Sequence, residues 1–173
     1  RKVVGAAFDT IIGRRLTEVG PVESQRSHKG NWQGYPYEKH LLRAQQHDEA
    51  LTLVAFFPVR APARRQVVLW IDGAGKRSLV NQQGGISPDS RDLLDAGMVV
   101  ISADLVYQGE FLERGQTLTQ ARVSTNPREY AGYTLGYNHT LFAQRVHDIL
   151  TLLSFTRSAL PDTKDIHLVG VNG

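Results

Sequence analysis

Three short, largely apolar runs constrain the fold of this chain most. They occupy residues 67–71, 98–103 and 166–170, and each is rich in valine, isoleucine or leucine. A strand with one face in water alternates between apolar and polar residues, whereas a continuous apolar run suits a strand that is buried on both faces. The three runs therefore predict strands of a parallel sheet that is covered by helices.

The segments between these runs carry helix signals. A capping serine, a proline in the first turn and an acidic residue at positions 87–89 predict a helix start, and Gly97 predicts its end. Asn138 or Thr140 is expected to cap a second, longer helix. The polar segment 104–137 predicts an active-site loop or an insertion. Strands that alternate with helices indicate an α/β sheet with right-handed crossovers.

The part of the chain before these runs is harder to interpret. Residues 37–46 and 51–57 are joined by a polar turn and predict an antiparallel hairpin at a sheet edge. In residues 1–36 the apolar residues do not recur with the spacing of a helix or of a strand. Within them, residues 20–36 are rich in glycine, serine, proline and polar side chains, which predicts a long loop.

Composition and charge exclude several classes of protein. With 41% hydrophobic and 21% charged residues, the chain is expected to fold rather than stay disordered. Its net charge of +3 comes from scattered basic pairs, so we expect no nucleic-acid partner. The absence of cysteine excludes disulfides, thiolate metal sites and a cysteine nucleophile. The apolar stretches are far shorter than a membrane span, so no membrane partner is expected.

The turn after the third run carries the most informative motif. The run continues directly into Gly170, Val171, Asn172 and Gly173. This sequence resembles the nucleophile elbow of the α/β-hydrolases, a sharp strand-to-helix turn that exposes a serine between small residues. In this alignment Asn172 occupies the position of the serine.

The turn after the first run resembles a second element of the same family. Asp72, Gly73 and Ala74 match a His-Gly segment in which a backbone N–H stabilises an oxyanion. The resemblance implies that the N–H groups of Ala74 and Gly173 form the oxyanion hole. Asp72 replaces the histidine that is usual at its position.

A third element agrees in order and spacing. Residues 96–104 resemble the next strand of the fold, and residues 108–110 resemble the glycine-containing loop after it. Among the subfamilies, the acetyl xylan esterase and dienelactone hydrolase-like groups fit best. The resemblance covers residues 37–173, which implies the N-terminal half of an α/β-hydrolase domain with a mostly parallel sheet and an antiparallel N-terminal hairpin. Residues 1–36 are then an extension or loop that packs on this body.

The resemblance implies a carboxylic-ester hydrolase that needs no cofactor. The expected substrate is a small-molecule ester or an acylated carbohydrate, such as one that carries acetyl groups. The acid and the histidine of the catalytic triad follow the elbow in this family. We therefore expect the C-terminal half of the same domain to be a partner of this chain. Expressed alone, the chain should lack a complete triad, and the exposed apolar edge of its last strand should make it aggregate or stay poorly folded.

The candidate site residues each have a structural interpretation beside the functional one. Asn172 is a catalytic remnant, a ligand-binding amide or only part of a tight turn, because Asn-Gly pairs favour turns. Asp72 either contacts substrate or caps its own turn by accepting backbone N–H bonds. Tyr133, Tyr137 and Asn138 either contact a sugar or an acyl group or pack a loop over the sheet.

The same residues are compatible with other functions and sites. The alternative function is a hydrolase-fold domain that has lost catalysis and serves as a carbohydrate-binding or scaffolding module, and Asn172 is its main support. A Rossmann-like nucleotide binder ranks lower because the dinucleotide fingerprint is incomplete. The six histidines are dispersed, so no metal site is expected. Arg145, His147 and Asp148 are expected to form a surface salt-bridge cluster.

The sequence leaves the cellular compartment open. The chain begins at Arg1 without a methionine. This is compatible with a soluble, exported protein whose leader is missing.

Overall fold

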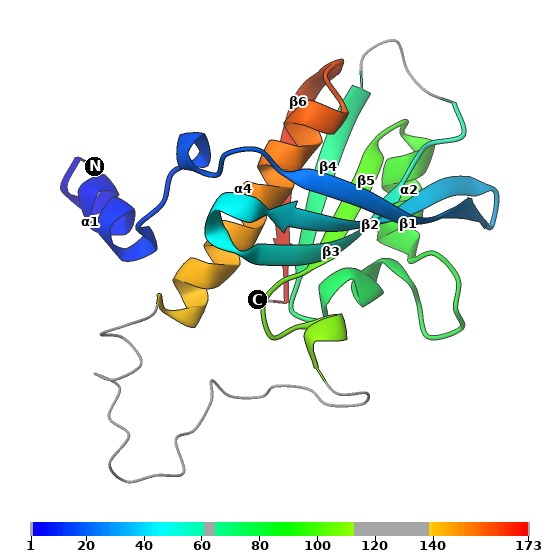
Figure 1. Ribbon diagram of the computed structural model, residues 1–173. Coiled ribbons are helices and arrows are strands. Elements are labelled where there is room, and N and C mark those ends of the chain that lie inside the picture. The colour runs from blue at the N-terminus through cyan, green and yellow to red at the C-terminus, as the bar shows by residue number, and fades with distance from the viewer. Residues whose placement is uncertain (1, 61–64, 113–138, 173) are drawn as a thin grey trace, which may run out of the picture.

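The computed structural model describes residues 2–60, 65–112 and 139–172, and Figure 1 shows their arrangement. These residues form one six-stranded sheet with the strand order β1-β2-β3-β5-β4-β6. The strands are β1 (Glu23–Trp32), β2 (Tyr35–Ala44), β3 (Glu49–Phe56), β4 (Arg65–Asp72), β5 (Val99–Asp104) and β6 (Thr163–Val171). The α-helices are α1 (Lys2–Ile12), α2 (Pro88–Asp95) and α4 (Leu141–Ala159). Short 3-10 helices are η1 (Leu16–Glu18), η2 (Gln45–His47), η3 (Gly75–Leu79) and η4 (Gly109–Phe111).

The parallel part of the sheet confirms the prediction from the apolar runs. β4 pairs in parallel with β5 on one side and with β6 on the other. Every residue of β5 is buried, as a strand covered on both faces requires. Because the three strands run in the same direction, their carboxyl ends lie at one edge of the sheet. The turns that follow β4 and β6, in which the sequence predicts the candidate site, therefore lie at this edge.

β6 differs from the prediction in its burial. It is a strand in the predicted place, but Leu168 is 60% exposed, so the burial on both faces that its apolar sequence suggested is not found. The physical reason is its position, since β6 is the last strand of the sheet within the described residues and pairs with β4 alone.

The N-terminal part of the sheet is antiparallel. β2 and β3 form the predicted hairpin, but it does not lie at the sheet edge, because β1 pairs with β2 on one side and β5 pairs with β3 on the other. The predicted loop over residues 20–36 is wrong, because β1 lies within it and pairs antiparallel with β2. Nearly all side chains of β1 are exposed, so no apolar alternation marks it in the sequence. Backbone hydrogen bonds to β2 keep β1 in the sheet. Such bonds form with any residue type except proline as donor, so the sequence of β1 does not reveal them.

Helices cover the two faces of the sheet separately. On one face, Leu69 and Ile101 pack with Leu152 and Phe155 of α4 in one buried cluster. On the other face, apolar side chains of the sheet such as Trp70 form a second cluster with residues of α2 and η3. This two-sided arrangement is the one that alternating strands and helices produce.

The helix starts follow the predicted capping chemistry. The Ser87 hydroxyl accepts a hydrogen bond from the Ser90 N–H, and Pro88 occupies the first turn of α2. Of the two candidate caps of the longer helix, Thr140 is the one observed, because its hydroxyl accepts from the Ala143 N–H. Among the described residues, no helix combines the length and apolarity that crossing a bilayer requires.

Candidate functional site

The turn after β4 lies against the end of β6. Asp72 and Val171 are partners in the parallel register, and the Gly73 N–H donates to the Val171 carbonyl at 3.3 Å. A Cβ atom on Gly73 would lie 2.4 Å from the carbonyl oxygen of Asn172. Only a glycine lets the two backbones approach this closely. Strand pairing therefore brings together residues that are about 100 positions apart in the chain.

Asn172 leaves β6 in a left-handed backbone conformation, with a φ angle of 49°. Asparagine adopts this conformation more readily than most residues. A strained residue directly after a strand is also the feature by which a nucleophile elbow exposes its side chain. The side chain of Asn172 is exposed at this edge of the sheet.

Asp72 joins the two turns. Its side chain is buried, its Oδ1 accepts from the Ala74 N–H at 2.8 Å, and its Oδ2 accepts from Asn172 Nδ2 at 3.3 Å. The first bond caps the turn after β4, which is the structural role considered for Asp72. The second bond orients the Asn172 amide. In this structure the Ala74 N–H that the resemblance assigns to an oxyanion is therefore engaged by Asp72.

Asp104, at the end of β5, braces the loops behind this turn. Its carboxylate is only 2% exposed and accepts hydrogen bonds from the backbone N–H groups of Lys76 and Glu110. The Lys76 ammonium donates to the same carboxylate and to the Thr52 hydroxyl. Asp104 thus connects η3, which follows β4, to η4, which follows β5. The geometry of the edge depends on this one buried carboxylate.

Comparison with known proteins bears on the fold. No protein-family model matches the sequence, and no curated protein is significantly similar to it. A solved structure from Bacteroides fragilis, assigned as an acetyl xylan esterase, superposes with a TM-score of 0.69 at 13% identity and covers 99% of this chain. The acetyl xylan esterase of a Paenibacillus species gives a TM-score of 0.57 at 11% identity over 95% of this chain. The chain has the α/β-hydrolase fold.

A third hydrolase-fold structure extends this likeness. A glucuronoyl esterase from Solibacter usitatus gives a TM-score of 0.52 at 10% identity and covers 87% of this chain. The chain spans about half the length of these structures, with 46%, 50% and 46% of their residues matched. At such low identities the likeness is one of fold, and the reaction has to be inferred from the site.

Within the hydrolase fold, the structure brings three predicted site residues together. Asp72, Ala74 and Asn172 lie at adjoining strand ends and share hydrogen bonds. The other predicted site residues, Gly173, Tyr133, Tyr137 and Asn138, lie outside the described residues. Within the described residues, no group of three or more His, Asp or Glu side chains is arranged to hold a metal ion.

The polar cluster on α4 does not lie at the surface, where the sequence predicted it. His147 and Asp148 were expected on the surface, but both are buried. The Ile12 carbonyl at the end of α1 accepts from His147 Nε2, and Glu49 at the start of β3 faces the other ring nitrogen. Both covering segments are distant in sequence, so the polar pattern of α4 alone could not reveal the burial.

Proposed function

We propose that the full-length protein hydrolyses carboxylic esters at the adjoining ends of β4 and β6. The observation that carries this proposal is the position of Asn172. It follows β6 with a left-handed backbone and meets the Gly73 turn, which supports the position that the resemblance assigns to the nucleophile elbow. The proposed substrates are acylated carbohydrates, and acetyl groups on plant polysaccharide fit the esterases that share the fold.

Asn172 determines which group can act as the nucleophile. Its amide cannot be converted into a nucleophile by giving a proton to a histidine. The nucleophile is therefore water, whose oxygen adds to the ester carbonyl carbon. A base takes the water proton, and the bond to the alcohol oxygen then breaks as that oxygen gains a proton. We assign the base to the triad histidine that follows the elbow in this family. Asn172 binds and orients the acyl group, and Asp72 holds its amide in place.

The proposed oxyanion hole consists of the N–H groups of Ala74 and Gly173. Because Ala74 donates to Asp72 Oδ1, an oxyanion has to replace that carboxylate oxygen as the acceptor. Substrate binding then requires that Asp72 Oδ1 leaves the Ala74 N–H, while Oδ2 keeps its bond to the Asn172 amide. Tyr133, Tyr137 and Asn138 are assigned to the binding of the sugar.

The second candidate function is a hydrolase-fold module that binds carbohydrate without cleaving it. Two observations favour it. Asn172 replaces a nucleophile, and Asp72 occupies a backbone donor that a catalytic site would keep free. Such a module would keep the shape of the substrate site and lose its reactive groups.

The substitution Asn172→Ser separates the two functions. If the catalytic base and the oxyanion donors persist, serine at this position becomes a nucleophile, and a fluorophosphonate probe should label it covalently. The adduct is measured by intact mass spectrometry of the full-length protein. Asn172→Ala, which offers no hydroxyl, is the control and should not react. An unlabelled Asn172→Ser protein with normal folding would favour the binding module.

A further inference from the structure

The turn after β5 lies beside the candidate site. The chain leaves β4 toward α2 on one face of the sheet, and it leaves β5 toward α4 on the other face. Open α/β sheets bind ligands where the connections of neighbouring strands diverge in this way. Asp104 joins the two sides, because its carboxylate accepts from the N–H groups of Lys76 after β4 and Glu110 after β5. Residues 105–108 follow Asp104 directly and therefore lie close to the turn that carries Ala74.

Tyr107 has an unusual backbone conformation in this turn. The Gln108 N–H donates to the Leu105 carbonyl at 2.8 Å, and the side-chain oxygen of Gln108 accepts from the Leu105 N–H at 3.2 Å. These bonds close a tight turn in which Tyr107 is the third residue, with a φ angle of 59°. Glycine and asparagine are usual at such a position, and a bulky side chain is strained there. Strain of this kind persists where the surroundings impose it, and it is concentrated at functional sites.

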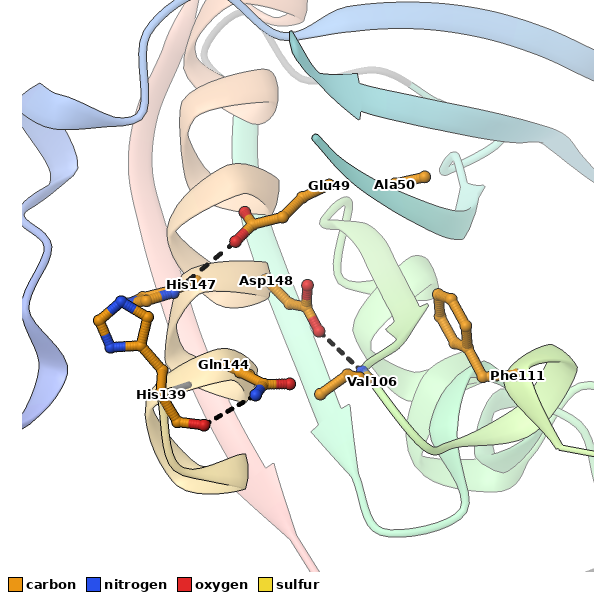
Figure 2. Close-up of a pocket in the computed structure, with 8 residues that line it drawn as sticks. All are labelled: Glu49, Ala50, Val106, Phe111, His139, Gln144, His147 and Asp148. Atoms are coloured by element: carbon orange, nitrogen blue, oxygen red, sulfur yellow. Dashed lines mark hydrogen bonds and ion pairs between the residues drawn. The ribbon is translucent and has the colours of Figure 1, made fainter. Parts of the chain in front are cut away.

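Two side chains of α4 hold the turn. Asp148 Oδ2 accepts from the Val106 N–H at 2.7 Å (Figure 2), and Arg145 Nε donates to the Val106 carbonyl at 3.2 Å. The residue before Tyr107 is thus fixed through both of its backbone polar groups. Asp148 is only 7% exposed, and together with Val106 and Phe111 it lines a pocket of about 380 Å³ beside the first turns of α4. The strained conformation of Tyr107 therefore has an identifiable cause in α4.

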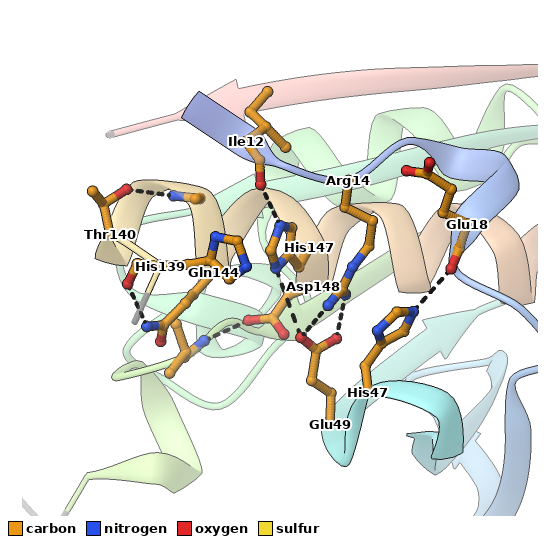
Figure 3. A network of polar contacts seen from close by, with 12 residues as sticks. Ile12, Arg14, Glu18, His47, Glu49, His139, Thr140, Gln144, His147 and Asp148 are labelled. Atoms are coloured by element: carbon orange, nitrogen blue, oxygen red, sulfur yellow. Dashed lines mark hydrogen bonds and ion pairs between the residues drawn. The ribbon is translucent and has the colours of Figure 1, made fainter. Parts of the chain in front are cut away.

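The stretch of α4 that carries Asp148 is itself held by other segments (Figure 3). The Ile12 carbonyl accepts from His147 Nε2 at 2.7 Å, and burial lowers the pKa of His147, which keeps the ring neutral near pH 7. Glu49 faces the other ring nitrogen at 3.7 Å and accepts two hydrogen bonds from Arg14, at 2.7 and 3.0 Å. The end of α1 and the start of β3 therefore keep this part of α4 in place.

The Asp148 carboxylate is an expensive way to hold a turn. Burial raises the pKa of Asp148 to about 7, although the Val106 N–H acts in the opposite direction. An aspartate in an unfolded chain ionises at about pH 4. Ionisation of Asp148 in the folded protein therefore lowers the free energy of unfolding at neutral pH. Stability alone does not account for this residue, whereas a need to fix the turn of Tyr107 does.

We propose that Tyr107 contacts a sugar ring of the substrate, and that Asp148 and Arg145 are positioning residues that hold its turn. The Tyr107 side chain is 47% exposed, so a ligand can reach it from solvent. A tyrosine has an apolar ring face and a hydroxyl that donates and accepts, which suits the C–H faces and hydroxyl groups of a sugar. The choice of a sugar rests on the proposed function, in which the substrate is an acylated carbohydrate.

The test is calorimetric titration of the full-length protein with xylohexaose, an oligosaccharide without ester groups. The unaltered protein should bind it, and Tyr107→Ala should bind it about tenfold more weakly, because the contact with the ring is lost. Phe8→Ala is the matched control. It removes a ring of similar exposure, 49%, from α1 and should bind as the unaltered protein does. No binding by the unaltered protein, or equal binding by Tyr107→Ala, overturns the proposal.

This titration separates the role of Tyr107 from ester hydrolysis, which the initial rate with p-nitrophenyl acetate measures. Weaker xylohexaose binding by Tyr107→Ala, without hydrolysis by the unaltered protein, would support the sugar contact and contradict the proposed reaction. Hydrolysis by the unaltered protein, beside xylohexaose binding that Tyr107→Ala leaves unchanged, would contradict the sugar contact alone.

Two further comparisons distinguish binding from structural support. Glycine adopts a positive φ angle without strain, so Tyr107→Gly should weaken binding as Tyr107→Ala does without lowering the melting temperature. Asp148→Ala removes the acceptor of the Val106 N–H and should weaken binding about as much, whereas Asp148→Asn keeps an acceptor there and should bind normally. A lower melting temperature of Tyr107→Gly, or normal binding by a folded Asp148→Ala protein, would contradict the assigned roles.

Discussion

Asp104→Ala is expected to lower the free energy of unfolding by about 3–5 kcal/mol. The substitution leaves the Lys76 ammonium, which is largely buried, without its main partner. It also removes the acceptor of two backbone N–H groups, those of Lys76 and Glu110. Glu110 still contacts the ammonium at 3.0 Å, but its side chain is mostly exposed and compensates weakly.

Two glycines support this expectation. Gly75 and Gly109 both have positive φ angles, and a Cβ on either would lie within 2.4 Å of the Asp104 carboxyl group. The loops are therefore built around this side chain. Urea denaturation of the full-length protein measures the effect, with Asp162→Ala as the exposed control. A loss below about 1 kcal/mol would show that the ion pair is no stronger than a surface one.

Gly73→Ala is expected to reduce the rate of ester hydrolysis at least about a hundredfold. The reason is space, because the new methyl group would lie 2.4 Å from the backbone oxygen of Asn172. The turn after β4 and the end of β6 have to move apart, and a displacement of about 1 Å in a catalytic geometry costs about this factor. The free energy of unfolding should fall by about 1–3 kcal/mol.

The control for this substitution is Gly5→Ala in α1, where an added Cβ meets no atom within 4 Å. It should leave the hydrolysis rate unchanged. Initial rates with p-nitrophenyl acetate and the melting temperature together separate a local effect from unfolding. If Gly73→Ala keeps full activity, the two turns do not form a common site.

The fold could be predicted from the sequence where strands are buried on both faces of the sheet. β4 and β5 are covered on both sides, so their residue types had to be apolar throughout, and the sequence reveals them. β1 is an exposed edge strand that backbone bonds hold in place, so polar residues suffice there. α1 was missed for a related reason, because Val4, Phe8 and Ile11 are exposed and Gly5 interrupts the helical pattern.

The candidate site was predictable through topology. Once β4 and β6 are recognised as parallel neighbours, their carboxyl ends must meet, and Asp72 and Asn172 follow. The pocket beside α4 was not predictable in this way. It depends on contacts of α4 with Ile12 and with Glu49, and no local pattern records which distant segments cover a helix.

The central claim is that Asn172 marks a working ester-hydrolysis site. The most direct test is the initial rate of p-nitrophenyl acetate hydrolysis by the full-length protein, measured beside its Asn172→Ala variant. We predict a rate above that of buffer, and a fall of at least about tenfold in the variant, because the amide that orients the acyl group is lost. A rate that the substitution leaves unchanged, or no rate above buffer, would contradict the claim.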